Sequence, residues 1–262
     1  MKASPEHVTG YPDAVISDST PQSKRDLVDS LIQRVEPFVP LEMQPLPQVT
    51  TGALAELGTW WLERMSGNLS AATINTDNDG DFVGGCETAN AAIDSGANLL
   101  VLISSLNQCS PEVRAIIGLL TRKDASAVYY QAHGTTDQSA MNSMAEIRDL
   151  IRKHTDIRGE ALQLAELDPC VDFASGVLLT ASARATPVIT GNAAHLAAAL
   201  ITQRLTMKAS NWWRHGSTSK DPAVTRSVDR LGIPQGLELD LTDHNGVGAR
   251  ISAQLLENFI LD

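Results

Sequence analysis

The feature that most constrains the fold is the nearly continuous apolar run Asn98–Ile103, which lies between two segments with helical patterns. A strand without polar alternation is typical of a parallel strand that is covered on both faces. A second strand, Pro187–Thr190, runs through Gly191 and Asn192 into an alanine-rich helix. Repeated strand–turn–helix units predict an α/β fold, with a doubly wound, mostly parallel Rossmann-like sheet and helices on both faces.

Helices are predicted wherever apolar residues recur at three- and four-residue spacing. They are expected at 23–35, 51–65, 87–95, 111–120, 139–154, 170–185, 193–202 and 251–261. We expect a disordered tail over 1–20, a small N-terminal helical lobe with its linker over 21–85, and the Rossmann-like domain over 86–262.

Two further segments are not assigned to a helix or a strand. Residues 66–85 are expected to form a solvated loop; part of it resembles a calcium loop in composition, but the residue six beyond Gly80 is Cys86 instead of an acid. The tryptophan-containing segment 211–216 is expected to pack at the sheet edge or in a dimer contact.

Composition excludes several classes of function. The formal net charge is −11 and the basic residues are scattered, so a nucleic-acid-binding surface is not expected. The three cysteines are far apart and the histidines lack paired ligand spacing, so we expect neither a disulfide framework nor a metal site. No apolar run reaches the roughly 20 residues of a membrane helix. We therefore expect a soluble, cytoplasmic protein without a membrane partner.

Polar or glycine residues follow three of the expected strands: 104–105, 190–192 and 243–248. In parallel α/β sheets, ligands bind beyond the carboxyl ends of the strands, where helix N-termini present unpaired backbone N–H groups. These three segments are therefore the predicted ligand site.

A series of motifs, in this order, resembles the nicotinate-nucleotide:dimethylbenzimidazole phosphoribosyltransferases, which act in the synthesis of the cobalamin lower ligand. The segments that carry the resemblance are Gly176–Ala181, Thr186–Gly191, Ser219–Pro222, Leu231–Pro234 and Gly246–Ala249, with weaker matches at Thr51–Leu57 and Gly96–Leu100.

The resemblance implies a homodimer whose partner helps to close each site, and no metal or redox cofactor. It implies that a glutamate removes a proton from the benzimidazole, which attacks the ribose of nicotinate mononucleotide and displaces nicotinate. Nicotinate mononucleotide and an aromatic base are thus the candidate ligands. The candidate substrate-binding residues are Ser104, Ser105, His133, Gly134, Thr135, Thr190, Gly191, Asn192, Gly246 and Gly248.

The sequence departs from the family at the expected catalytic base. Aligning the closing Gly-Glu-Gly-Thr-Gly-Ala motif of the family on Gly246 and Gly248 places the base at Asn245. An amide cannot accept the proton. The neighbouring His244 and Asp243 are candidate substitutes, because an imidazole titrates close to neutral pH.

Four further departures surround the expected ligand. The segment 103–111 has no glycine, whereas the phosphate loop of the family has three; His133 stands in place of an arginine, and Thr190 in place of an aspartate. A long family insert that helps to hold the benzimidazole is absent, because 68–85 spans that interval directly.

The combined changes favour a divergent homologue whose activity is altered or lost. The alternatives are an active phosphoribosyltransferase that uses His244 or Asp243, a non-catalytic nucleotide-binding or partner subunit of a heteromeric complex, and a structural remnant.

Overall fold

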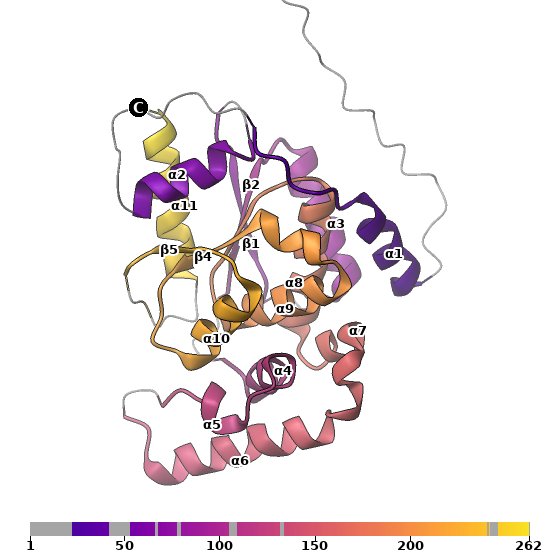
Figure 1. Cartoon of the computed structure of the whole chain (residues 1–262), viewed down its shortest axis with the longest axis vertical. Coiled ribbons are helices and arrows are strands. Elements are labelled where there is room, and N and C mark those ends of the chain that lie inside the picture. The colour runs from indigo at the N-terminus through magenta and orange to yellow at the C-terminus, as the bar shows by residue number, and fades with distance from the viewer. Residues whose placement is uncertain are drawn as a thin grey trace, which may run out of the picture.

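The computed structural model describes residues 23–41, 53–65, 68–77, 80–104, 109–131, 134–239, 241 and 246–261. At its centre is a five-stranded, all-parallel sheet whose strands are neighbours in chain order, from β1 to β5 (Figure 1). The strands are β1 (Ala71–Asn75), β2 (Leu99–Ile103), β3 (Val188–Thr190), β4 (Trp213–Ser217) and β5 (Gln235–Leu237).

The helices surround this sheet and connect its strands. Those before β2 are α1 (Lys24–Arg34), α2 (Ala53–Leu62) and α3 (Phe82–Asp94). Those between β2 and β3 are α4 (Pro111–Thr121), α5 (Ala125–Val128), α6 (Asp137–Lys153), η1 (Asp156–Gly159), α7 (Ala161–Ala165) and α8 (Pro169–Ala183). The remaining helices are α9 (Ala193–Leu205), η2 (Met207–Trp212), α10 (Pro222–Leu231) and α11 (Val247–Leu261).

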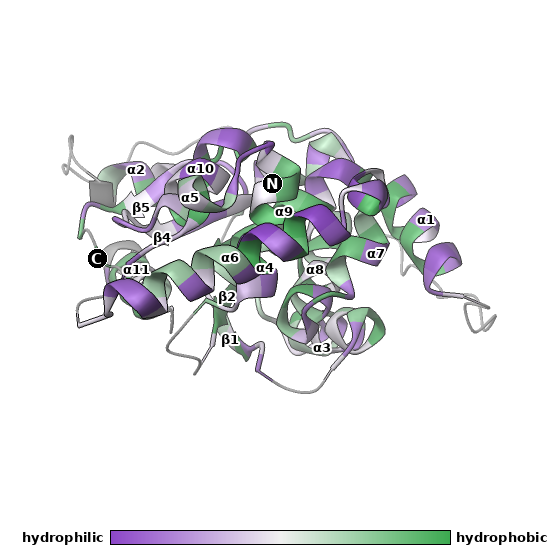
Figure 2. Ribbon diagram, turned by 90° about the horizontal axis from the view of Figure 1, so that it is seen from below, coloured by the Kyte–Doolittle hydropathy of each residue, from purple (hydrophilic) through white to green (hydrophobic). Residues whose placement is uncertain are grey.

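Two hydrophobic clusters lie on opposite faces of the sheet, because alternate residues of a strand point to opposite sides. Leu100 and Leu102 of β2 join the larger cluster with α3, α4, α8, α9 and α10. Leu99 and Val101 join the smaller cluster with α2 and α11, which lie side by side in Figure 1. Figure 2 shows hydrophobic ribbon along the interior helices α8 and α9.

The predicted α/β class, parallel sheet and helices on both faces are confirmed. The strand order does not reverse, so the crossover helices gather on one face of the sheet. The other face is covered by α2 and α11.

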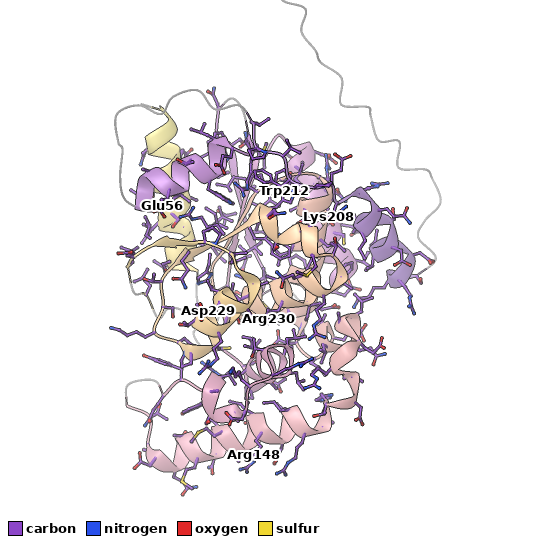
Figure 3. All side chains as sticks on the ribbon, in the orientation of Figure 1. Glu56, Arg148, Lys208, Trp212, Asp229 and Arg230 are labelled. Atoms are coloured by element: carbon purple, nitrogen blue, oxygen red, sulfur yellow. The ribbon has the colours of Figure 1, made fainter. Side chains whose placement is uncertain are left out.

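Helix α2 is held against the sheet by Arg214 of β4, whose side chain is almost completely buried. Its guanidinium donates hydrogen bonds to the carbonyl oxygens of Glu56 and Gln235, each at 3.1 Å. Glu56 lies on α2 and is labelled in Figure 3. Its carboxylate is 3.9 Å from the same guanidinium. Backbone carbonyls therefore satisfy Nε and Nη1 of this charged residue, whereas its buried Nη2 has no hydrogen-bond partner among the described residues.

Three sequence interpretations are corrected. The interval expected to be a solvated loop contains β1 and the start of α3, and β1 pairs with β2. The segment 211–216 does not lie at the sheet edge, since it contains most of β4, which pairs with both β3 and β5. Trp213 is fully buried, and Trp212 meets Phe38 edge to face at 5.7 Å between ring centroids. The strand expected directly before 243–248 is Gln235–Leu237, which ends several residues earlier.

Within the described ranges, no helix is both long enough and apolar enough to cross a lipid bilayer. The expected tail over 1–20 lies outside the described residues.

Candidate functional site at the carboxyl edge of the sheet

Gly246, which directly precedes α11, lies against the carboxyl ends of the central strands. A Cβ built on Gly246 would lie 3.0 Å from the Cα of Ile103, the last residue of β2. A Cβ on Gly191, which follows β3, would lie 2.6 Å from the Cα of Gly246. Gly246 has φ +78°, a conformation that favours glycine. The structure thus brings together several predicted site residues: Ser104, Thr190, Gly191, Asn192, Gly246 and Gly248.

A carboxylate stands at the same edge, beside the end of β2. Ser104 donates a hydrogen bond to Asp77 Oδ1 at 2.5 Å, and Ser104 itself is buried. The preceding residue, Thr76, fixes the end of β1 to that of β2: its N–H and its hydroxyl both donate to the Ile103 carbonyl, at 3.0 and 3.1 Å. Asp77 was not among the predicted site residues, because β1 was not recognised in the sequence.

His195 of α9 is a buried, neutral member of this edge. Its Nδ1 lies 3.1 Å from the backbone nitrogen of Gly191 and must accept that N–H. The ring proton is therefore on Nε2, which donates to Thr76 Oγ1 at 2.9 Å. Burial, together with a smaller effect of the neighbouring His215, lowers the pKa of His195 to about 3. The uncharged imidazole of α9 therefore forms hydrogen bonds with the residue that follows β1 and with the residue that follows β3.

The two strand ends in the middle of the sheet are joined by a second histidine. Thr190 Oγ1 lies 3.0 Å from His215 Nδ1, so this hydrogen bond links β3 to β4. Asn192 caps α9, because its Oδ1 accepts the backbone N–H of His195 at 3.0 Å. Thr190 and Asn192 are therefore held in place by neighbouring strands and helices.

Carboxylates occupy the N-terminus of α3, the helix that follows β1. Asp81 caps it by accepting the Gly84 N–H at 2.9 Å, and Asp172 of α8 accepts the Phe82 N–H at 3.2 Å. Lys24 of α1 forms an ion pair with Asp172 at 2.7 Å. The first N–H groups of this helix are thus engaged by acidic side chains of the chain itself.

The N-termini of α4, α8 and α10 are also capped by side chains of the chain itself. Ser110 caps α4 and donates its hydroxyl to Asp168 at 2.8 Å, and Asp168 caps α8. Asp221 caps α10 and pairs with Arg114 of α4 through two hydrogen bonds, at 3.0 and 2.8 Å. Both partners of this ion pair are buried. Helix ends of the kind that bind anions elsewhere are therefore occupied here by the chain's own side chains.

Several candidate residues fall elsewhere. Gly134 and Thr135 lie in the connection between α5 and α6, where the Thr135 carbonyl accepts a local hydrogen bond from Gln131 at 3.3 Å. Five candidates lie outside the described residues: Ser105, His133, Asp243, His244 and Asn245.

Burial governs the chemistry of the cysteine thiols. It raises the pKa of Cys86, Cys109 and Cys170 to about 12, so these thiols are protonated at neutral pH. In the part of the chain that the structure describes, no group of His, Cys, Asp and Glu side chains is arranged to hold a metal ion.

Comparison with known families agrees with this architecture. Residues 81–260 match the family DBI_PRT, described as phosphoribosyltransferase. The chain belongs to this family. The match covers more than half of the sequence, and it confirms the resemblance inferred from the motifs.

The match with each of two individual relatives covers only part of that relative's length. The nicotinate-nucleotide–dimethylbenzimidazole phosphoribosyltransferase of Streptomyces avermitilis is 31% identical over 179 residues, which are 67% of this chain and 48% of that protein. The protein of the same name from Mycobacterium tuberculosis is 25% identical over 204 residues, 76% of this chain and 56% of that protein. The chain thus spans about half the length of the curated relatives it matches.

A solved structure has the same fold. The crystal structure of CobT from Thermus thermophilus superposes with a TM-score of 0.60 and 22% sequence identity, covering 68% of this chain and 54% of that one.

Proposed function

We propose that the chain is a divergent phosphoribosyltransferase homologue that binds a nucleoside or nucleotide at the carboxyl edge of its sheet, with the transfer activity of the family altered or lost. The observation that carries this proposal is the place of Gly246 against Ile103 and Gly191. The residue directly before Gly246 is Asn245, where the resemblance expects the catalytic glutamate.

Asparagine in place of glutamate at position 245 has a chemical consequence. By resemblance, the glutamate accepts a proton from the benzimidazole nitrogen as that nitrogen attacks the ribose. An asparagine amide is not basic enough for this step. General-base catalysis contributes roughly 10²–10⁴-fold to such rates, so transfer to dimethylbenzimidazole is expected to be slower by about that factor.

The test follows nicotinate release from nicotinate mononucleotide in the presence of dimethylbenzimidazole, at millimolar donor concentration. Wild type, Asn245→Glu and the matched control Asn245→Gln are compared with a curated relative. We expect slow or undetectable release by the wild type and by Asn245→Gln, and a faster rate with Asn245→Glu. A wild-type rate equal to that of the relative would refute the proposal.

The substitute bases are tested in the same assay. If the wild type releases nicotinate, the variants His244→Gln and Asp243→Asn identify which neighbour accepts the proton. Loss of release in only one of them would support the alternative of an active enzyme with a relocated base.

A second candidate is a non-catalytic partner subunit of a heteromeric complex. It is supported by the coverage, because the matches span 48% and 56% of two curated relatives. It predicts that the chain alone is inactive and that co-purification with a full-length relative changes the relative's rate. Light scattering of the chain alone tests the expected homodimer.

A further inference from the structure

β1 forms an open edge of the sheet. It is the first strand in the order β1-β2-β3-β4-β5 and pairs with β2 on one side only. In Figure 2 it lies at the rim of the ribbon, outside β2. The strand at the opposite edge, β5, is three residues long and two of them are buried. β1 is five residues long and three of them are exposed. Of the two edges of the sheet, the one at β1 is therefore the longer and the more accessible.

The backbone of β1 alternates between its partner strand and the open side. The Thr76 N–H donates to the Ile103 carbonyl at 3.0 Å, and the Ser70 carbonyl accepts the Leu99 N–H at 3.3 Å. Even-numbered residues thus face β2, and successive residues of a strand face opposite sides. The residues that turn their N–H and carbonyl groups outward are Ala71, Thr73 and Asn75. The described part of the chain supplies no hydrogen bond to these outward groups.

This edge lacks the features that protect other edge strands from further pairing. Natural sheets protect their edges with lysine, proline, inward-pointing charges or bulges. The sequence from Ser70 to Thr76 contains no charged residue and no proline. The register with β2 is continuous over all five residues, so no bulge interrupts it. The three residues whose backbone faces outward also have exposed side chains. An edge of this kind is a template for a further strand.

We infer that a second copy of this chain pairs with β1 in antiparallel orientation, so that two five-stranded sheets join into one. A two-fold axis through Thr73 makes the strand complementary to itself. In this register Thr73 lies opposite Thr73 of the second copy, and Ala71 lies opposite Asn75. All of these residues turn their backbone outward, so each pair exchanges two N–H···O bonds. The inference goes beyond the proposed function, because it involves no ligand.

The charge of the chain and the size of the contact set the strength of this dimer. Each copy has a formal net charge of −11, so the copies repel one another at long range. At the strands, Asp77 lies opposite Leu69 of the second copy, so its carboxylate does not face a like charge. A pair of five-residue strands is small beside the standard interface of about 800 Å² per partner, so we expect a Kd of about 1–100 µM.

The experiment measures sedimentation velocity of the full chain over about 1–300 µM, which spans the expected Kd. Thr73→Lys brings two cations face to face at the two-fold axis. Thr73→Pro removes an outward N–H and no hydrogen bond to β2, so the sheet of the monomer is kept. We expect each variant to raise the Kd of the dimer at least about tenfold. The matched control Thr73→Val keeps a β-branched, uncharged side chain and should leave the Kd unchanged.

Two measurements on the wild type do not depend on the folding of a variant. Raising NaCl from about 0.05 M to about 0.5 M should strengthen the dimer, because salt screens the repulsion between the copies. The outward N–H groups of Thr73 and Asn75 should exchange with deuterium more slowly at high protein concentration than at low.

A chain that stays monomeric over the whole concentration range would overturn the inference. So would a dimer that both Thr73→Lys and Thr73→Pro leave intact, or outward N–H groups whose exchange does not depend on concentration. Failure of the nicotinate-release assay would leave this inference untouched, because no measurement here uses a ligand.

Discussion

Replacing Gly191 with alanine tests how tightly the last turn packs on the sheet. The added Cβ would lie 2.5 Å from the Leu102 carbonyl oxygen and 2.6 Å from the Cα of Gly246. Ordinary contacts between such atoms are about 3.5 Å or longer. Both neighbours are backbone atoms, so no change of rotamer can relieve the overlap. Overpacking of this kind costs about 1–3 kcal/mol, and relief requires the start of α11 to move away from β2 and β3.

The measurement is thermal unfolding, with Gly159→Ala as the matched control. A Cβ on Gly159 meets nothing within 4 Å, so its substitution should change stability by less than about 0.5 kcal/mol. In a chain of this size, 1 kcal/mol shifts Tm by about 2–4 °C, so Gly191→Ala should lower Tm by roughly 2–12 °C. If Gly191→Ala unfolds at the same temperature as Gly159→Ala, the turn does not lie against β3 as described.

Two further predictions concern buried polar groups. Asp221→Ala leaves the Arg114 guanidinium buried without its partner and removes the cap of α10, so we expect a loss of about 3–5 kcal/mol in urea unfolding. Asp149→Ala removes only an exposed ion pair and should cost at most about 1 kcal/mol; equal costs would contradict the buried pairing. Burial lowers the pKa of His195 from 6.5 to about 3, so the unfolded chain binds the extra proton between these pH values. The free energy of unfolding should therefore decrease as pH falls through this window, by up to about 1.4 kcal/mol per pH unit from this residue. The pKa of the less buried His154 is also lowered, by burial and by Lys153, so His195→Gln should reduce that slope more than His154→Gln does. Equal slopes would argue against a neutral buried His195.

The sequence predicts best the elements whose signal is local. β2 is apolar throughout and is buried on both faces, so composition alone identifies it as a central parallel strand. The start of α4 is equally clear, because Ser110 caps the helix and Pro111 occupies its first turn. For both elements, the residues that determine the structure lie within the element or beside it.

The missed strands depend on partners that are distant in sequence. β4 contains Arg214, His215 and Gly216, which do not resemble a buried strand. Arg214 can be buried because carbonyl oxygens of α2 and β5 accept its hydrogen bonds, and His215 because it shares a hydrogen bond with Thr190. β1 was missed because it lies at the sheet edge and most of its residues are exposed or half-buried.

The early start of α3 has a steric cause that the sequence did not suggest. Gly85 was taken as part of a loop, yet it lies inside α3; Gly176 lies inside α8, as expected for the helix 170–185. A Cβ on Gly85 would collide with the Phe173 carbonyl of α8, and one on Gly176 would collide with the Phe82 carbonyl of α3. These glycines allow the two helices to pack backbone against backbone, which offsets their low helix propensity.

The candidate site likewise has features that are local in the sequence and features that depend on distant residues. Strand ends could be located from the sequence, so Ser104, Gly191 and Gly246 were placed at one edge before their contacts were known. The position of the Asp77 carboxylate could not be located in this way, because Asp77 and Ser104 follow different strands and meet only in the assembled sheet. The contacts at this edge are therefore a property of the assembled sheet and its helix N-termini.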